Sequence, residues 1–210
     1  MDFNLNNEQQ LLRDGITKFL AARYDLETSR AAAKTGVGWQ PEIWRAFAGE
    51  LGILGATFPE EFEGIGGGAV ELMVITEALG HALVIEPYVD AVVVAGGLLR
   101  RAGGPAAAGV LTELIAGDAV AALAAAEPDS GDRWQDAAAL AQPDGDGWVL
   151  NGAKITVLGA PLATHLLVTA RIAGDDGLSM FLTEAGAAGI QLHPYRTIDD
   201  RSAADITFTE

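Results

Sequence analysis

The strongest constraint in this sequence is a change of pattern near residue 117. Before it, apolar residues recur at helical spacing, as Leu12, Ile16, Phe19 and Leu20 do. After it, short apolar runs alternate with clusters of Gly and Asp, a pattern typical of strands. A chain that changes pattern once is expected to form two successive units, the first helical and the second built from strands.

Local signals predict where the helices begin and end. Asn6 is expected to cap the first helix, with Gln9 completing a capping box. Pro41 stands where the first residue of another helix belongs, and Gly117 is expected to end the last helix of this half. Further helices are expected over residues 69–83 and 105–116. Residues 88–101 stay ambiguous, because their valines favour a strand and their length favours a helix.

The second half contains two turn signals and several runs of strand length. Asn151-Gly152 is the typical sequence of a two-residue hairpin turn, and residues 143–147, "PDGDG", predict another turn. The expected strands include "HLLVTARI", "LSMFLTE" and "ADITFTE". We therefore expect an α+β protein of two domains: an all-α helical domain over residues 1–117 and a β domain, of the barrel or sandwich kind, over residues 118–210.

Composition excludes several classes of partner. The net charge of −16 argues against nucleic acid and against an anionic membrane surface. No apolar run approaches the ~18 residues of a spanning helix, and the N-terminus does not resemble a signal peptide. The chain has no cysteine, which excludes disulfides and thiolate metal sites. A cytoplasmic location without a bound metal is the expectation.

Several motifs that could indicate a binding site have simpler structural explanations. The glycine-rich "EGIGGG", residues 63–68, lacks the Lys-Ser/Thr of a P-loop, and a tight turn between helices is the better interpretation. The three histidines, His81, His165 and His193, lack the spacing of a metal site. A tryptophan could stack on a planar cofactor, but core packing is the expectation for all four, which are Trp39, Trp44, Trp134 and Trp148.

Four segments together resemble the acyl-CoA dehydrogenases. "NNEQQLLRDGITKFL" is similar to that family's opening helix, and "LGILGATFPEEFEGIGGG" to its Pro-Glu-Glu turn. "AAAEPDSGD" resembles the Thr-Glu-Pro-x-x-Gly-Ser-Asp signature, and "WVLNGAKITVLGA" the Leu-Asn-Gly-x-Lys-x-Trp-Ile-Thr-Asn segment. The four occur in the family's order and cover the whole chain. The pimeloyl-CoA dehydrogenase small subunits are the most similar branch.

The resemblance implies a fold, an activity and partners. The family has a helical domain, a middle β domain and a C-terminal helical bundle, and this sequence ends near the end of the middle domain. Its enzymes desaturate an acyl-CoA between the α and β carbons, with FAD as hydride acceptor and electron-transfer flavoprotein as reoxidant. The family's catalytic glutamate belongs to the bundle, so we expect no catalytic base in these residues. A homo- or hetero-oligomer with another dehydrogenase subunit is expected.

The resemblance also places the expected binding residues and their departures. The acyl pocket is expected at Tyr88, Val89 and Val92. Ala126 and Leu158 replace hydroxyl residues, Thr156 replaces an indole, and Asp132 replaces a serine. These losses are expected to weaken FAD binding. The expected cofactor-binding residues are Leu123, Ala125, Ala126, Gly131, Asp132, Thr156, Val157 and Leu158.

Three interpretations of function stay open at this point. The chain is interpreted as part of a flavin-dependent acyl-CoA dehydrogenase, with a rival in which it is a non-catalytic subunit that has a degraded flavin site and shapes a partner's site. A weaker third alternative is altered chemistry on the same fold, such as a flavin monooxygenase or a nitroalkane oxidase. The acidic charge and the side chains at Ala126 and Leu158 favour the rival.

Overall fold

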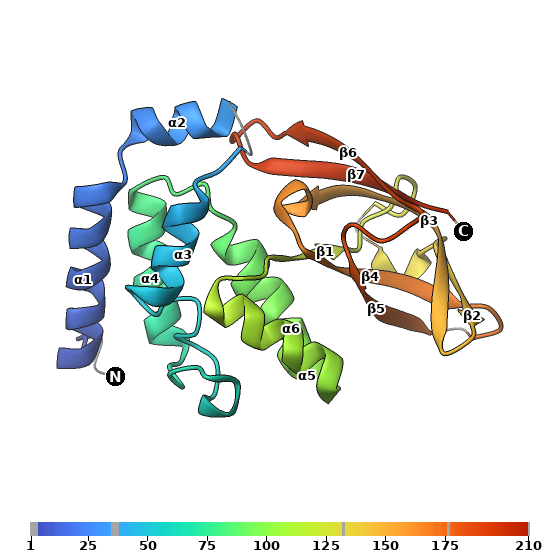
Figure 1. Cartoon of the computed structure of the whole chain (residues 1–210), viewed down its shortest axis with the longest axis horizontal. Helices are drawn as coiled ribbons and strands as arrows, with labels where there is room; N and C mark the ends of the chain where they lie inside the picture. Colours follow the sequence, from blue (N-terminus) through green and yellow to red (C-terminus); the bar gives the residue numbers. More distant parts are fainter. Residues whose placement is uncertain (1–3, 35–37, 132, 176, 210) are drawn as a thin grey trace.

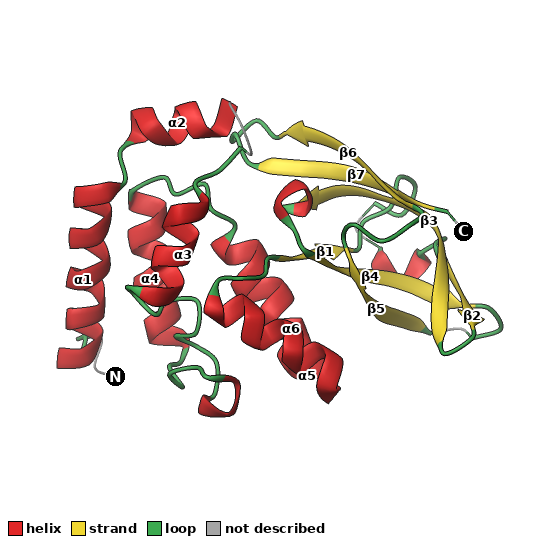
Figure 2. Cartoon of the chain, in the orientation of Figure 1, coloured by secondary structure: helices red, strands yellow, loops and turns green. Residues whose placement is uncertain are grey.

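The computed structural model describes residues 4–34, 38–131, 133–175 and 177–209. Helices occupy the first half and a curled sheet the second, and the two lie side by side (Figure 1). Figure 2 shows the same division by secondary structure, with helices on the left and strands on the right. The expected fold class, an all-α unit followed by a β unit, is confirmed.

The helical half contains six α-helices in the described residues: α1 (Asn7–Arg23), α2 (Leu26–Lys34), α3 (Pro41–Gly49), α4 (Ala69–His81), α5 (Gly97–Ala102) and α6 (Gly104–Ala116). A 3-10 turn, η1 (Glu60–Phe62), and a π-helix, η2 (Tyr88–Gly96), complete it. The ambiguous run 88–101 is therefore helical, first as η2 and then as α5.

The predicted helix ends follow from local chemistry. The Asn6 side chain accepts a hydrogen bond from the Gln9 amide at 2.8 Å, and the Gln9 side chain accepts one from the Asn6 amide at 3.0 Å. Pro41 is the first residue of α3, as expected. Gly117 adopts φ +82° and ends α6, a backbone conformation that glycine allows at little cost. All three predictions are confirmed.

The glycine-rich segment 63–68 is a turn that leads into α4, as predicted. A Cβ atom built on Gly64 would lie 2.1 Å from the Phe58 carbonyl oxygen, so the backbones meet too closely for any side chain. Backbone packing therefore explains Gly64 and also Gly67, where a Cβ atom would lie 2.6 Å from the Ala56 carbonyl oxygen.

The β half has seven strands in the described residues: β1 (Ala121–Ala124), β2 (Leu140–Asp144), β3 (Gly147–Leu158), β4 (His165–Ile172), β5 (Leu178–Glu184), β6 (Ile190–Arg196) and β7 (Ser202–Phe208). Short 3-10 turns, η3 (Trp134–Asp136) and η4 (Ala160–Leu162), lie between them. The strand order is β1-β4-β2-β3-β7-β6, with β5 paired to β4. The strand β3 joins the two halves of the sheet, pairing first with β2 and then with β7.

The hairpin turn predicted at Asn151-Gly152 is wrong. Both residues lie inside β3, and the β2–β3 hairpin turns instead at residues 145–146 within the other predicted signal. Gly152 marks the point where β3 leaves β2 for β7, and a Cβ there would lie 2.8 Å from the Ala139 Cα. Glycine is required here by close backbone approach rather than by a turn.

One hydrophobic core joins the helices to the sheet. The cluster that contains the side chains of the helices continues into Val120, Ala121 and Leu167. A second cluster lies within the curled sheet, around Val157, Leu166 and Ile206. Because η2 packs directly on β1, the end of β1 is held at the junction of the two halves.

Candidate functional site at the junction of helices and sheet

A cavity of about 180 Å³ opens where β1 ends. Five of the expected cofactor residues meet in it: Leu123, Ala125, Ala126, Thr156 and Leu158. They come from two segments more than thirty residues apart, the end of β1 and the end of β3. The remaining lining residues are Asp90, Val94, Trp134 and Ile155.

A bulge in β3 brings the two segments together. The pairing of β3 with β7 shifts between Lys154 and Val157, and Thr156 adopts φ +53°. The Ile155 amide, freed from the regular ladder, donates to the Ala126 carbonyl oxygen at 2.9 Å. A β-branched residue at positive φ is strained, and such strain is held only where neighbouring contacts fix it. The bulge thus directs the Ile155–Thr156 segment towards the cavity.

A buried ion pair connects the two segments that line the cavity. Lys154, which has no exposed side-chain area, places its ammonium 2.6 Å from a carboxylate oxygen of Glu127. The ammonium also donates to the Thr169 hydroxyl at 3.0 Å and to the Ala125 carbonyl oxygen at 3.3 Å. Glu127 belongs to the β1 segment and Lys154 to β3, so the pair ties the two walls of the cavity together.

The Glu127 carboxylate is also bound by backbone groups. It accepts from the Ala138 amide at 2.6 Å and from the Ala139 amide at 3.2 Å. Burial opposes the ionised carboxylate, but the hydrogen bonds from Lys154 and these amides outweigh it and hold the pKa of Glu127 below its usual value. Burial lowers the pKa of Lys154, and Glu127 opposes that shift. Because these hydrogen bonds outweigh burial, the Glu127 carboxylate is ionised at neutral pH. The Lys154 ammonium beside it is its counter-charge.

Two of the other expected cofactor residues, Val157 and Gly131, are not part of the cavity lining. Val157 is buried between the layers of the sheet, in the cluster with Leu166 and Ile206. Gly131 adopts φ +57° in the turn after Ser130, with open space around its Cα. Asp132 lies outside the described residues.

A second cavity, of about 330 Å³, lies beside η2 and receives part of the expected acyl pocket. Tyr88 and Val89 line it. The Tyr88 hydroxyl donates to the Ile53 carbonyl oxygen at 3.1 Å, and burial raises the pKa of Tyr88. Val92 is only 1% exposed and lies in the helical core, so a direct contact with a ligand would require η2 to move.

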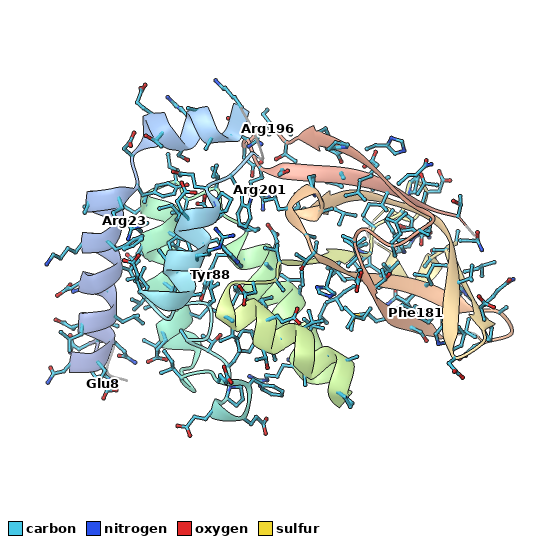
Figure 3. All side chains as sticks on the ribbon, in the orientation of Figure 1. Glu8, Arg23, Tyr88, Phe181, Arg196 and Arg201 are labelled. Carbon is cyan, nitrogen blue, oxygen red and sulfur yellow. The ribbon has the colours of Figure 1, made fainter. Side chains whose placement is uncertain are left out.

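Asp90, which sequence reasoning did not select, lines both cavities. Its carboxylate lies 3.4 Å from the Arg201 guanidinium, which also lies 2.7 Å from Asp199. Figure 3 labels Arg201 at the junction between helices and sheet, with Tyr88 among the helices. Burial raises the pKa of Asp90, and Arg201 opposes the shift. The Asp90–Arg201 pair therefore joins η2 to the β half.

Removing Arg201 is expected to destabilise the protein by about 1 kcal/mol, because half-exposed ion pairs are weak. The folded-state pKa of Asp90 is raised, so its ionised form weakens the fold above that pKa and protonation removes the penalty below it. Arg201→Ala should therefore cost most near neutral pH and least in acid. Asp90→Asn should cost less than Arg201→Ala, and adding it to Arg201→Ala should restore stability. Urea unfolding at several pH values measures this, and equal costs at all pH values would contradict it.

No group of three or more His, Asp or Glu side chains in the described part of the chain is placed to hold a metal. Two of the tryptophans expected in the core are instead half exposed: Trp134 at 51% and Trp148 at 46%. The expectation of core packing is wrong for these two, whereas Trp44 is buried and packs against Trp39. The part of the structure that is described also contains no helix long and apolar enough to cross a membrane.

Comparison with known families assigns both halves of the chain. Residues 6–118 match the family model of the acyl-CoA dehydrogenase N-terminal domain, and residues 122–210 match that of the middle domain. The chain belongs to the acyl-CoA dehydrogenase family. The family suggested by the four sequence segments is thereby confirmed.

Individual relatives agree with this assignment. The acyl-CoA dehydrogenase FadE27 of Mycobacterium tuberculosis is 31% identical over 191 residues, which is 90% of this chain and 49% of FadE27. An L-prolyl peptidyl-carrier-protein dehydrogenase of a Serratia species is 29% identical over 91% of this chain and 51% of its own length. The chain thus spans about half the length of the curated relatives it matches.

Solved structures also superpose on the whole chain. The ChsE4–ChsE5 complex from Mycobacterium tuberculosis aligns with a TM-score of 0.86 and 28% identity, over 100% of this chain and 56% of that one. The FAD complex of PigA aligns with a TM-score of 0.86 and 26% identity, over 100% of this chain and 57% of that one.

The smaller cavity has a mostly apolar lining. Val94 and Leu158 provide apolar surface and Trp134 an exposed indole, and the polar residues of the lining are Asp90 and Thr156. The short side chains of Ala125 and Ala126 leave the backbone at the end of β1 open to close approach. Planar aromatic ligands favour such apolar and aromatic surfaces with a few polar groups nearby.

Three functional features escaped sequence reasoning, and one carried a usable signal. Lys154 is the only charged residue in "VLNGAKITVL", and a charged residue in a buried strand requires a partner. Glu127, in the other cofactor segment, is the nearby carboxylate that could have been paired with it. Asp90 gave no comparable signal, because its importance depends on tertiary placement. Trp134 could be expected to stack on a planar cofactor, but core packing is the more common role of a tryptophan.

Proposed function

We propose that the chain is part of a flavin-dependent acyl-CoA dehydrogenase that desaturates the acyl group of a thioester between its α and β carbons. The observation that carries this proposal is the convergence of residues 123–126 and 155–158 on one cavity beside η2. Acyl-CoA is the proposed substrate, and electron-transfer flavoprotein the proposed oxidant of the reduced cofactor. A cytoplasmic location stays a prediction.

FAD is the proposed cofactor, and when bound it supplies the hydride acceptor. The residues of this chain would orient it: Trp134, Leu158 and the backbone at Ala125–Ala126 form the walls, and the Glu127–Lys154 pair holds those walls in place. Ala126 and Leu158 offer no side-chain hydrogen bond. We therefore propose that FAD binds weakly to this chain alone or is shared with a partner subunit.

The domain limits 1–117 and 118–210 stay our proposal. The substrate side is proposed at the larger cavity beside Tyr88 and Val89, which meets the cofactor cavity at Asp90. Asp90 is held by Arg201, and we propose no catalytic base among the described residues. Positioning of the ligand is then the main contribution of this chain.

The alternative is a non-catalytic subunit that shapes a partner's site. The apolar residues at positions 126 and 158 favour it, as does the net charge of −16, which does not attract anionic FAD or CoA. A homo- or hetero-oligomer fits both candidates. The ChsE4–ChsE5 relative is a complex, and this chain exposes Leu11, Val70 and Met73 on helices α1 and α4.

An activity assay distinguishes the candidates. We expect purified residues 1–210, with added FAD, to show no acyl-CoA-dependent reduction of a ferrocenium acceptor with short, long or dicarboxylic acyl-CoAs. We expect turnover after addition of a dehydrogenase subunit that carries a carboxylate base. Turnover by the chain alone would place a base within it, and Asp90→Asn should then abolish it. Turnover with a partner that is unaffected by loss of FAD from this chain would favour the non-catalytic alternative.

A further inference from the structure

Trp134 is the first residue of η3, in the loop between β1 and β2. Half of its side chain is exposed, although it faces the cavity formed by Ala126, Thr156 and Leu158. Aromatic rings of the described residues pair as Phe19 with Phe47, Trp39 with Trp44 and Trp148 with Phe181, and none of these pairs includes Trp134. An exposed indole beside a concave apolar surface is a typical ligand contact.

Specific contacts hold the loop that carries Trp134. On its first side, the Arg133 amide donates to the Ser130 carbonyl oxygen at 3.0 Å, and Arg133 pairs with Asp136 at 3.2 Å. On its second side, the amides of Ala138 and Ala139 donate to the buried Glu127 carboxylate. The segment that follows Trp134 is therefore tied to the same carboxylate that fixes the walls of the cavity.

Among the described residues that line the cavity, those of the β3 segment are not aromatic. Thr156 occupies the bulge of β3, and its hydroxyl accepts a hydrogen bond from the Tyr195 hydroxyl at 3.2 Å. Its amide donates to Asp205 at 2.9 Å. Thr156 is thus hydrogen-bonded to strands β6 and β7. The aromatic residue among the described residues that line this cavity is Trp134.

We propose that the indole of Trp134 forms the aromatic wall against which the flavin ring packs, in place of the indole that Thr156 does not supply. This inference rests on the proposed function, because it takes FAD as the ligand. An electron-rich indole and a flat heteroaromatic ring favour offset stacking, and such a contact requires no hydroxyl at positions 126 or 158. Trp134 is a cofactor-positioning residue in this proposal.

The affinity for FAD tests the proposal on the full chain. We expect Trp134→Ala to weaken FAD binding about tenfold, which is the effect of one favourable aromatic contact. Trp134→Phe should keep most of the affinity, because it keeps an aromatic face. Trp148→Ala is the matched control: Trp148 is similarly exposed but packs edge-on against Phe181, with ring centroids 5.3 Å apart and away from this cavity. The readout is quenching of flavin fluorescence, with circular dichroism to verify folding.

Each result decides a separate question. If the wild-type chain binds FAD and Trp134→Ala binds it equally well, the role of Trp134 is wrong and the proposed function stands. If Trp134→Ala binds FAD more tightly, the indole hinders FAD binding, and the proposed role of Trp134 is wrong. If the wild-type chain binds no FAD, alone or with a partner subunit, the proposed cofactor site and the role of Trp134 fall together.

Discussion

Replacing Lys154 with methionine is expected to lower the free energy of unfolding by about 3–5 kcal/mol. The variant would keep most of the side-chain volume but leave the Glu127 carboxylate buried beside a thioether. Charges in the protein interior are tolerated only when they are paired and hydrogen-bonded. The pair also ties the β1 segment to β3, so we expect the walls of the cofactor cavity to loosen as well.

The matched control is an exposed ion pair of the same length. Arg23 lies 2.6 Å from Glu50, and both side chains are substantially exposed. Arg23→Met should cost less than about 1 kcal/mol, because solvent screens the pair. Adding Glu127→Gln to Lys154→Met should recover part of the loss by removing the unpaired charge. Urea unfolding of the four proteins measures these differences, and equal costs at Lys154 and Arg23 would contradict a structural role for the buried pair.

The Glu127–Lys154 pair also predicts how the free energy of unfolding changes at low pH. The pKa of Glu127 in the folded protein lies below its ordinary value of 4.5. Its contribution to stability is therefore complete above that ordinary pKa and is lost as the pH falls through the lower, folded-state pKa. In Lys154→Met the carboxylate can relieve its burial by taking up a proton. The stability difference between wild type and Lys154→Met should thus shrink in acid.

Replacing both Ala126 and Leu158 with threonine is expected to tighten FAD binding roughly tenfold to a hundredfold. Both positions line the cofactor cavity, and each hydroxyl would add a hydrogen bond worth about 0.5–1.5 kcal/mol. Leu178→Thr, at the start of β5 and away from the cavity, is the control for general effects of a new hydroxyl. Fluorescence titration with FAD gives the three affinities. An unchanged affinity in the double variant would mean that the two segments have only a structural role.

Helix ends could be predicted because their causes are local. The Asn6–Gln9 capping box, the start at Pro41 and the stop at Gly117 each depend on neighbours within four residues. The sheet depends on distant neighbours and was predicted less well. Gly152 serves a close approach to Ala139 rather than a turn, and β6, which contains Pro194, was not predicted. The valine-rich run at 88–96 forms a π-helix where it packs on β1.

Only part of the candidate site could be predicted from the sequence. The resemblance selected Leu123, Ala125, Ala126, Thr156 and Leu158, and these residues do meet in one cavity. Their assignment to FAD stays a prediction. The supporting contacts were not predicted, because the Glu127–Lys154 pair, the placement of Asp90 and the exposure of Trp134 arise only when the segments fold against one another. Tertiary contacts of this kind leave little trace in local pattern.

Hydrogen–deuterium exchange of residues 1–210 with and without FAD tests the central claim most directly, because it locates the ligand on the chain. The proposed site predicts slower amide exchange in residues 123–131 and 155–159 when FAD is present, with unchanged exchange in α1 and β5. The same protection should weaken in Trp134→Ala at equal FAD concentration. FAD-dependent protection confined to other segments, or none at saturating FAD, would contradict a flavin site at the junction of β1 and β3.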